Sequence, residues 1–370
     1  MTKSSPDPQD PAVPPVPDVW VISDGVAGMR FQSLALAEAM GWTAASGFHD
    51  IIAAPRQPLR SLPHLGRIPM LASLLPISTP PLPLADNGFP DILVTCGRRM
   101  AGISIAIRQR ARASGHHMKT IHIQDPRLDP ACFDILLVPA HDPARGSNVI
   151  VSTGSLNRLT PDAIADAART LDAKWIKAGF PRVAVMLGGD NRRYRISPKM
   201  ARHMALKLAR FATHTNASLA VVPSRRTPPD LIRHLTETLM IDTLAIDSQS
   251  SHQIATPQDT NPYPGILGVA DAIIVTSDSV NMASEATITG KPVMIAGWKD
   301  DTGLGNTGHG DTGHGDTGHG ETGRLAAFHD AMMQGGHTMP LGDNIRDHNV
   351  TPLDEMPAVC ARVKTLLERG

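Results

Sequence analysis

Short runs of consecutive apolar residues alternate with helix-like patterns along the first 155 residues of the chain. The first run covers residues 19–23 and ends at a turn over residues 24–28. Further apolar runs and one helical pattern follow at 92–96, 98–113 (the helix), 120–123, 134–138 and 148–151. Unbroken apolar runs separated by helices are typical of a parallel sheet that is covered on both faces. The pattern therefore predicts a Rossmann-like domain over residues 18–155.

The same alternation starts again in the second half, after a predicted linker helix within residues 156–181. Apolar runs here cover residues 182–187, 218–222, 271–276 and 292–295. Helical patterns at 197–213 and 279–289 lie between them, and Gly290 is a stop signal for the second helix. We predict a second Rossmann-like domain over residues 182–335, and hence an α/β fold of two such domains facing across a cleft.

Three segments fall outside this alternation. Residues 1–17 contain six prolines and are predicted to form a disordered leader, and residues 336–370 are predicted to form a tail that carries an amphipathic helix. Residues 301–323 repeat a five-residue glycine motif that includes His309, His314 and His319. Imidazoles could ligate a transition metal, but so much glycine leaves the ligands unheld. We therefore interpret this segment as a flexible surface loop and expect no metal site.

Residues 55–90 are rich in proline and leucine, with Arg56, Arg60 and Arg67 interspersed. One interpretation is a long irregular excursion over the first domain. The other is a surface whose apolar residues enter a lipid layer while the arginines contact headgroups. The second interpretation would make the chain a peripheral membrane protein that acts on a lipid-linked acceptor.

Composition narrows the classes of partner and compartment. The 370 residues include 35 Lys and Arg against 35 Asp and Glu, so the chain lacks the positive excess of a nucleic-acid backbone binder. The three cysteines show no paired spacing, which argues against a disulfide framework or a thiolate zinc site and favours a reducing compartment. No apolar run reaches the length of about 18 residues of a membrane span, and no signal-peptide core is present, so we expect a cytoplasmic protein.

Glycine turns follow the first strand of each predicted domain. Gly25 and Gly28 lie in the first turn, and Gly188 and Gly189 lie in the second, with Asn191 close behind. Glycine lets the backbone approach a ligand closely, and the start of the following helix presents unpaired N–H groups to anions. We expect ligand pockets at the carboxyl edges of both sheets, where open α/β sheets bind ligands.

Two more turns of the second domain carry polar side chains. One contains Ser224, Arg225, Arg226 and Thr227, whose guanidinium groups match phosphate oxygens in charge and geometry. The other, residues 276–286, contains Asp278, Ser279, Asn281, Met282 and Glu285. Ser279 is a helix cap, so the amides around Asn281 and Met282 should face the cleft. Glu285, about two turns into that helix, is expected at an open position where its carboxylate accepts two sugar hydroxyls.

Residues 276–293 run through a strand, a polar turn, Ser-Glu-Ala and Gly-Lys-Pro-Val, and they resemble the donor-binding segment of two-domain (GT-B) glycosyltransferases. More closely, the chain resembles bacterial-type members of the mitochondrial fission (elongated mitochondria) family. The stretches that carry this resemblance are 23–28, 32–34, 96–99, 122–127, 188–191, 224–228 and 278–282. They span residues 19 to about 335.

These resemblances imply a glycosyltransferase that moves a sugar from a nucleotide-diphospho-sugar to an acceptor, without a metal or another cofactor. The donor-binding residues would be Gly188, Gly189, Asn191, Ser224, Arg225, Arg226, Thr227, Asp278, Ser279, Asn281, Met282 and Glu285. The acceptor-binding residues would be Gly25, Gly28, Gln32 and Arg98. Asp24, or else Asp125, would be the base that deprotonates the acceptor hydroxyl.

Two alternatives bear on this hypothesis. Plant members of the fission family are implicated in mitochondrial division through a dynamin-related partner, which implies a non-catalytic binding or scaffold protein that retains the cleft. A short-chain nucleotide-sugar epimerase would need a tyrosine with a lysine four residues later, and neither Tyr194 nor Tyr263 has one. We therefore exclude the short-chain epimerase class.

Overall fold

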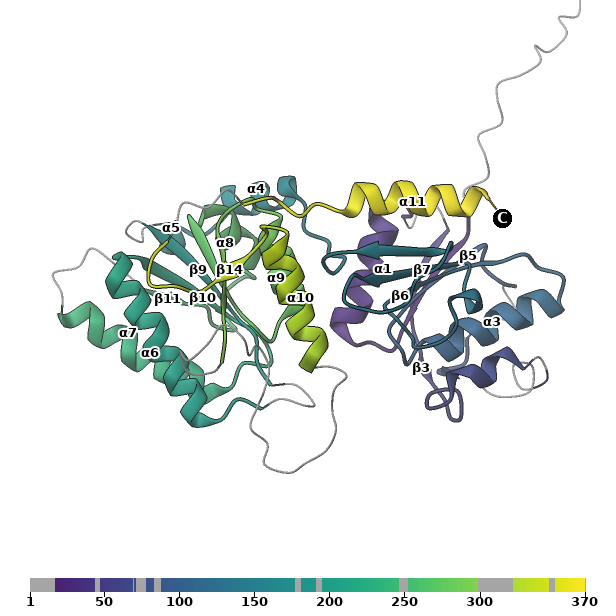
Figure 1. Ribbon diagram of the computed structural model, residues 1–370, viewed down its shortest axis with the longest axis horizontal. Coiled ribbons are helices and arrows are strands. Elements are labelled where there is room, and N and C mark those ends of the chain that lie inside the picture. The colour runs from purple at the N-terminus through teal and green to yellow at the C-terminus, as the bar shows by residue number, and fades with distance from the viewer. Residues whose placement is uncertain are drawn as a thin grey trace, which may run out of the picture. The chain divides into compact units, whose positions relative to one another are not determined.

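The computed structural model describes residues 17–43, 47–68, 70, 78–82, 88–176, 181–190, 195–245, 252–298, 322–345 and 350–369 (Figure 1). Asn191, nearly all of the predicted leader and the repeat up to residue 321 lie outside these residues. The chain divides into two compact units. The first unit comprises residues 1–136 with 365–370, and the second unit comprises residues 137–364.

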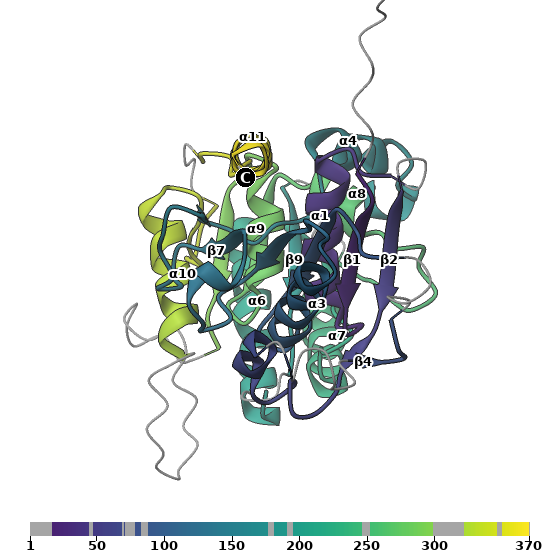
Figure 2. The same ribbon diagram turned by 90° about the vertical axis from the view of Figure 1, so that its right-hand side faces the viewer.

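A first six-stranded sheet has the order β2-β1-β5-β6-β7-β8. Its strands are β1 (Val19–Ser23), β2 (Phe48–Ile52), β5 (Ile92–Cys96), β6 (Lys119–Ile123), β7 (Ile135–Pro139) and β8 (Val149–Ser152). The helices along this part of the chain are α1 (Ala27–Ala39), α3 (Ala101–Ala113) and the 3₁₀ turns η2 (Pro63–Arg67) and η3 (Pro130–Cys132). A separate antiparallel pair joins β3 (Ala54–Pro55) to β4 (Ser78–Thr79). Strand β1 pairs in parallel with β2 and β5, and Figure 2 shows β1 and β2 side by side.

A second six-stranded sheet has the order β11-β10-β9-β12-β13-β14, and all of its pairs are parallel. Its strands are β9 (Arg182–Leu187), β10 (Ser218–Pro223), β11 (Gln253–Ile254), β12 (Ala272–Thr276), β13 (Val293–Ala296) and β14 (Met339–Pro340). The helices are α4 (Pro161–Arg169), α5 (Ala173–Ile176), α6 (Pro198–Thr215), α7 (Pro229–Ala245), α8 (Tyr263–Val269), α9 (Val280–Thr287), α10 (Thr322–Gln334) and α11 (Met356–Glu368). The prediction of a parallel α/β fold is therefore confirmed, while the cleft between the domains stays a prediction.

The second sheet is covered on both faces because successive residues of a strand point to opposite sides. Val183, Val185 and Leu187 of β9 pack into one apolar cluster with α6 and α7. Ala184 and Met186 of the same strand pack into another cluster with α8, α9 and α10. Figure 1 shows α6 and α7 on one side of this sheet and α9 and α10 on the other. Burial on both faces explains why β9 reads as an unbroken apolar run.

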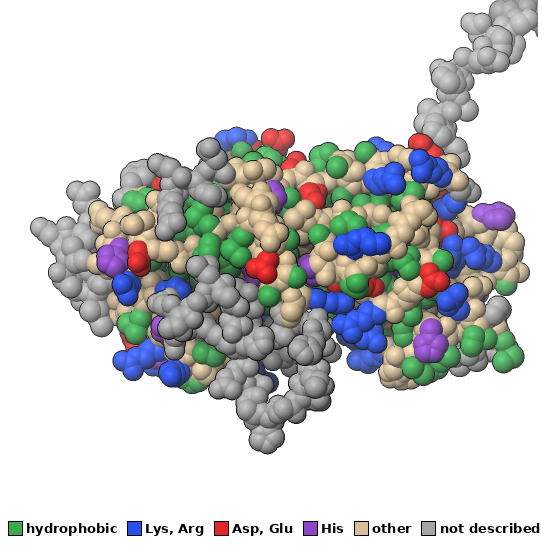
Figure 3. Space-filling model, in the orientation of Figure 1, with side chains coloured by type: hydrophobic (Ala, Val, Ile, Leu, Met, Phe, Trp, Pro, Cys, Tyr) green, Lys and Arg blue, Asp and Glu red, His purple; other side chains and the backbone are tan. Residues whose placement is uncertain are grey.

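The surface is mixed in charge, as expected from equal numbers of acidic and basic residues. Figure 3 shows blue basic and red acidic side chains on the same face. Among the described residues, no helix is long and apolar enough to cross a membrane.

Candidate functional site

The glycine turn after β9 packs directly against two neighbouring turns of the second unit. A Cβ on Gly188 would lie 2.0 Å from Asp278 Oδ2, and a Cβ on Gly189 would lie 2.0 Å from the carbonyl oxygen of Arg226. The amides are also in use: Gly188 donates to Thr276 Oγ1 at 2.7 Å and Gly189 donates to Asp278 Oδ2 at 2.7 Å. These glycines are therefore required for close packing between strand ends.

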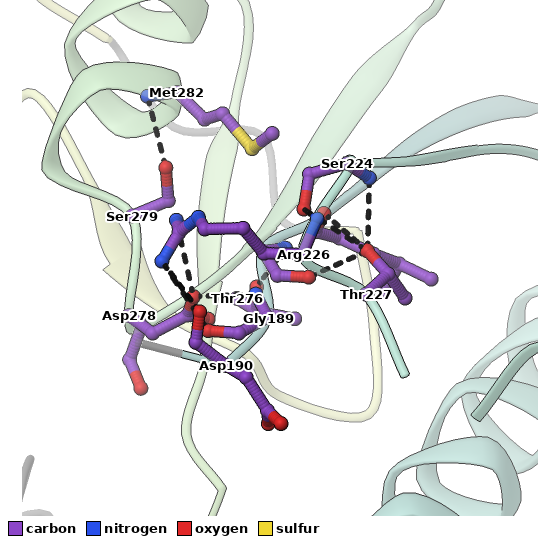
Figure 4. Close-up of polar contacts among 12 residues, drawn as sticks. Gly189, Asp190, Ser224, Arg226, Thr227, Thr276, Asp278, Ser279 and Met282 are labelled. Atoms are coloured by element: carbon purple, nitrogen blue, oxygen red, sulfur yellow. Dashed lines mark hydrogen bonds and ion pairs between the residues drawn. The ribbon is translucent and has the colours of Figure 1, made fainter. Parts of the chain in front are cut away.

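Asp278 joins the ends of several strands (Figure 4). Its side chain is only 3% exposed, and Oδ1 accepts a hydrogen bond from Trp298 Nε1 at 3.0 Å. Arg226 Nη2 lies 3.8 Å from Oδ2, and Arg226 Nη1 also donates to the carbonyl oxygens of Gly189 and Asp190. A buried carboxylate needs such hydrogen bonds and a nearby cation to offset its lost hydration. Asp278 and Arg226 thus hold the edge of the second sheet together.

In the turn after β10, some polar side chains form hydrogen bonds within the protein, whereas another is exposed to solvent. Thr227 Oγ1 accepts a hydrogen bond from the Ser224 amide at 2.8 Å and lies 2.6 Å from the carbonyl oxygen of Gly188, to which it donates. Arg225, between them, is exposed and has no hydrogen-bond or ion-pair partner among the described residues. Arg225 is therefore the side chain of this turn that is free to meet a ligand.

A hollow of about 980 Å³ opens beside Arg225. Its walls come from the ends of β10 and β11, from α7 and from residues 255–262, and they include Ile232, Thr256 and Asn261. The exposed wall surface is mostly apolar, as in many small-molecule sites, and it also carries charged side chains such as Arg225, Arg233 and Asp259.

Helix α9 begins at the same edge of the sheet. Ser279 is its N-cap, and Ser279 Oγ accepts a hydrogen bond from the Met282 amide at 3.4 Å. The amides of Val280 and Asn281 have no acceptor among the described residues. The first turn of a helix carries a partial positive charge, so these donors favour an anion.

Glu285 is less open than expected, while its role as a ligand of sugar hydroxyls stays a prediction. It is half-buried, and Tyr263 Oη donates to Glu285 Oε2 at 2.5 Å. Burial raises the pKa of the Glu285 carboxyl, an effect that the hydrogen bond from Tyr263 partly opposes. Burial and the neighbouring carboxylate also raise the pKa of Tyr263. Tyr263 was missed as a site residue because only the fold brings α8 beside α9.

In the first unit, Asp24 is held inside its own turn. Its side chain is 4% exposed, Oδ1 accepts from the Val26 amide at 3.2 Å and Oδ2 lies 2.9 Å from Arg99 Nη1. Gly25 has a φ of +79°, which permits the sharp turn before α1. Gln32 is buried, and its Nε2 donates to the carbonyl oxygen of Gly28 at 3.3 Å. Of the predicted acceptor side chains, Arg98 is the exposed one.

Asp125 lies in a strained turn after β6. Asp125 Oδ1 accepts from the Arg127 amide at 2.7 Å, and the carboxylate is buried. Gln124 and Arg127 have left-handed φ values of +72° and +57°, which residues with side chains rarely adopt. His122 just before the turn is fully buried, and burial lowers its pKa to about 3, so this imidazole stays neutral at physiological pH.

No group of three metal-ligating side chains occurs in the part of the chain that the structure describes. The histidines of the glycine repeat lie outside that part.

Comparison with known proteins adds the family. A model of the family described as Mitochondrial fission ELM1 matches residues 27–367. The chain belongs to this family. It is 27% identical over 232 residues to the mitochondrial fission protein ELM1 of Arabidopsis thaliana, a match that covers 56% of this chain and 52% of the plant protein. The match thus spans about half the length of that relative. It is also 26% identical over 313 residues to the uncharacterized protein RP120 of Rickettsia prowazekii, covering 75% and 82% of the two chains.

Among solved structures, the chain is similar to UDP-GlcNAc 2-epimerase from Methanocaldococcus jannaschii, with a TM-score of 0.51 and 12% identity over 95% of this chain and 99% of that one. UDP-GlcNAc 2-epimerase from Neisseria meningitidis gives a TM-score of 0.47 and 15% identity, again over 95% and 99%. At this identity the likeness concerns the fold alone. The two-domain GT-B architecture of the Methanocaldococcus jannaschii enzyme confirms the prediction of two Rossmann-like domains.

Proposed function

We propose that the chain is a metal-independent glycosyltransferase of GT-B type that takes a nucleotide-diphospho-sugar as donor. The observation that carries this proposal is the edge of the second sheet, where the start of α9 and the exposed Arg225 both offer donors to an anion. An enzyme of similar fold is named for a nucleotide sugar, UDP-GlcNAc, which supports the class of donor.

The donor residues take two kinds of role in this proposal. Arg225, Ser279 and the amides around Asn281 and Met282 would contact the diphosphate, and Asn191 stays with them as a predicted ligand. Gly188, Gly189, Ser224, Arg226, Thr227 and Asp278 would position those donors, since their polar groups already bond to one another. Glu285 would accept ribose hydroxyls through Oε1, with Tyr263 fixing the other oxygen.

Transfer would break the bond between the anomeric carbon and the diphosphate while the acceptor oxygen bonds to that carbon. Arginine and amide N–H groups would stabilise the departing diphosphate, which becomes more negative as the bond breaks. The acceptor would bind at the turns that contain Gly25, Gly28, Gln32 and Arg98 in the first unit. Asp24 is the proposed base for the acceptor proton, with Asp125 second, and Asp24 would have to open its ion pair with Arg99 to reach an acceptor.

A second candidate function is a non-catalytic binding protein that retains the nucleotide site. The name of the Arabidopsis relative, a mitochondrial fission protein, favours this alternative. One experiment separates the two. The full chain is incubated with UDP-, GDP- and CDP-sugars, and both the melting temperature and the release of nucleoside diphosphate are followed. Binding together with release supports transfer, binding without release favours the binding protein, and no binding contradicts both.

We further propose that the protein is cytoplasmic and contacts a membrane surface through part of residues 55–90. Leu62, Ile68 and Met70 are 47%, 43% and 65% exposed. Arg60 and Arg67 are exposed beside them, and residues 51–85 contain no Asp or Glu. Apolar side chains flanked by arginines suit an anionic bilayer. Changing the three apolar residues to Ser should abolish sedimentation with phosphatidylglycerol vesicles, whereas Leu206→Ser, at an exposed site on α6, should not.

A further inference from the structure

Three neighbouring strands of the first sheet end side by side in the first unit. Ile22 of β1 pairs with Thr95 of β5, and Cys96 of β5 pairs with Ile123 of β6. The turns that follow these parallel strands cover residues 24–26, 97–99 and 124–127. They therefore share the carboxyl edge of the sheet, where open α/β sheets bind ligands.

The charges at this edge do not cancel. Asp24 pairs with Arg99, and Arg30 pairs with Asp50. Asp125 is turned inward onto the Arg127 amide. Arg98 and Arg127 are exposed, and neither has a hydrogen-bond or ion-pair partner among the described residues. Arg98 and Arg127 therefore form no ion pair among the described residues, and the four arginines against three aspartates named here leave this edge one positive charge in excess.

The helices that start at this edge are also left without caps. Neither α1 nor α3 has a side-chain N-cap or an acidic residue in its first turn. By contrast, Thr160, Ser197 and Ser279 cap α4, α6 and α9 in the second unit. The start of α1 therefore leaves N–H donors and partial positive charge available to an anion, whereas the first turn of α3 is buried against residues 59–66.

A buried polar atom at the same edge also lacks a partner. Ser23, the last residue of β1, is 1% exposed, and its Oγ bonds to no described residue. Its neighbour Ile22 packs into the cluster that contains α3, which includes no residue of α1. Since side chains alternate along a strand, Ser23 faces the opposite side of the sheet. A hydroxyl there can complete an oxyanion site together with amides and arginines.

The turns themselves are held in conformations that cost energy. Gln124 and Arg127 both have left-handed φ values, although each has a side chain. Strained residues of this kind cluster at ligand sites, because the surrounding structure keeps them in place for binding. The strain at Arg127 directly involves one of the two unpaired arginines.

We propose that this edge binds a phosphate group, with Arg98 and Arg127 as its guanidinium donors. Their planar forks match phosphate oxygens in charge and geometry. The phosphate site stands on these observations alone. We also infer that the sugar acceptor carries this phosphate, an inference that rests in addition on the proposed function.

Calorimetric titration of the full chain with inorganic phosphate and with glycerol 3-phosphate tests the site. Arg98→Gln and Arg127→Gln should each weaken binding about tenfold, because each removes a charge-assisted hydrogen bond. Arg112→Gln is the matched control, since this exposed arginine lies in the last turn of α3, away from the helix start.

Vesicles distinguish a lipid headgroup from a soluble phosphate. Phosphatidylcholine vesicles receive either phosphatidic acid or phosphatidylserine at equal surface charge. A preference for phosphatidic acid that the Arg98→Gln/Arg127→Gln variant loses assigns the site to a lipid. Soluble phosphate binding without that preference assigns it to a soluble ligand. Failure to bind either form, or a loss caused equally by Arg112→Gln, overturns the proposal.

The two proposals fail separately. If no nucleotide sugar binds or is cleaved while phosphate binding still depends on Arg98 and Arg127, the transferase proposal falls and the phosphate site stands. If nucleoside diphosphate is released while phosphate does not bind, the phosphate site falls and the donor site stands.

Discussion

The carboxyl edges of the two sheets are built in opposite ways. In the second sheet, the turns after β9, β10 and β12 bond to one another, and Asp278 is buried among them. In the first sheet, the corresponding turns use left-handed backbone at Gly25, Gly97, Gln124 and Arg127 and leave two arginines unpaired. Both edges contain internal bonds, but those of the second edge join three separate turns and leave Arg225 exposed, whereas the first edge leaves Arg98 and Arg127 exposed on adjacent turns.

This difference separates glycines and arginines that look alike in the sequence. Gly188 and Gly189 are needed because other turns press against them, whereas Gly25 is needed for its φ of +79°. Arg226 and Arg99 satisfy carboxylates of their own units, whereas Arg225 and Arg98 do not. Ligand roles are therefore better assigned to Arg98 and Arg225, the first arginine of each motif, than to the motif as a whole.

The largest effect is expected for Gly189→Ala. The new Cβ would lie 2.0 Å from the backbone oxygen of Arg226, so the two turns must separate. Such overpacking should lower the free energy of unfolding by about 3 kcal/mol, measured by urea denaturation. Gly297→Ala is the control, since nothing lies within 4 Å of a Cβ there, and it should change stability by less than about 0.5 kcal/mol. If both changes lowered the free energy of unfolding equally, the packing around Gly189 would be no closer than the packing around Gly297.

Asp278→Ala comes next. It leaves the Gly189 amide and Trp298 Nε1 without their acceptor, and each is in or beside a buried turn. Loss of the acceptor should cost about 2–3 kcal/mol of unfolding free energy, as judged by the urea midpoint at constant slope. Asp230→Ala removes an exposed carboxylate of the same unit and should change little. A similar small change for Asp278→Ala would contradict its role in holding the strand ends.

Much of the fold could be predicted from the sequence because the central strands are buried on both faces. The apolar runs at β5, β9 and β12 were predicted at their observed positions. Strand β2 was not predicted, since Phe48–Ile52 contains His49 and Asp50 and its residues are half-buried or exposed. Strand β11 has only two residues, which is too short for a periodic pattern.

The sequence predicts where the candidate residues lie in the fold but not which role each one has. The glycine and arginine motifs follow strands, as expected, and their role as a ligand site stays a prediction. Their contacts, however, join residues far apart in the chain, such as Gly189 with Asp278 or Tyr263 with Glu285. The local sequence does not show that Asp278 faces inward or that Arg225 faces outward, because packing between the turns determines the orientation of both side chains.

The contrast between Arg225 and Arg226 is sharpened by changing each to Gln. A nucleotide sugar at about a hundred times its dissociation constant should stabilise the wild-type fold by about 2.7 kcal/mol. If Arg225→Gln weakens binding tenfold, that stabilisation should fall to about 1.4 kcal/mol, with no change in the unliganded protein. Arg226→Gln should instead lower the melting temperature without ligand, because it loses its bonds to the Gly189 and Asp190 carbonyls. Thermal-shift curves with and without a UDP-sugar measure both effects. If instead Arg226→Gln weakened nucleotide-sugar binding and Arg225→Gln lowered the melting temperature without ligand, the roles of the two arginines would be reversed.

The smallest expected effect is a change in pH dependence at Glu285, a half-buried carboxyl of the second unit. Burial raises its folded pKa above the ordinary value of 4.5, so the folded state holds a proton that the unfolded state has already released. Stability from this group is therefore fully present below about pH 4.5 and declines as the pH rises through the folded pKa. Glu285→Gln should remove that decline and make the protein more stable than wild type at neutral pH, in urea titrations from pH 4 to 8. Tyr263→Phe is the informative partner variant: it removes the bond that opposes the shift, so the decline should extend to higher pH. If Glu285→Gln left the pH profile unchanged, the carboxyl would be solvated, and the second edge would then be open at the ribose position, as the first edge is at its arginines.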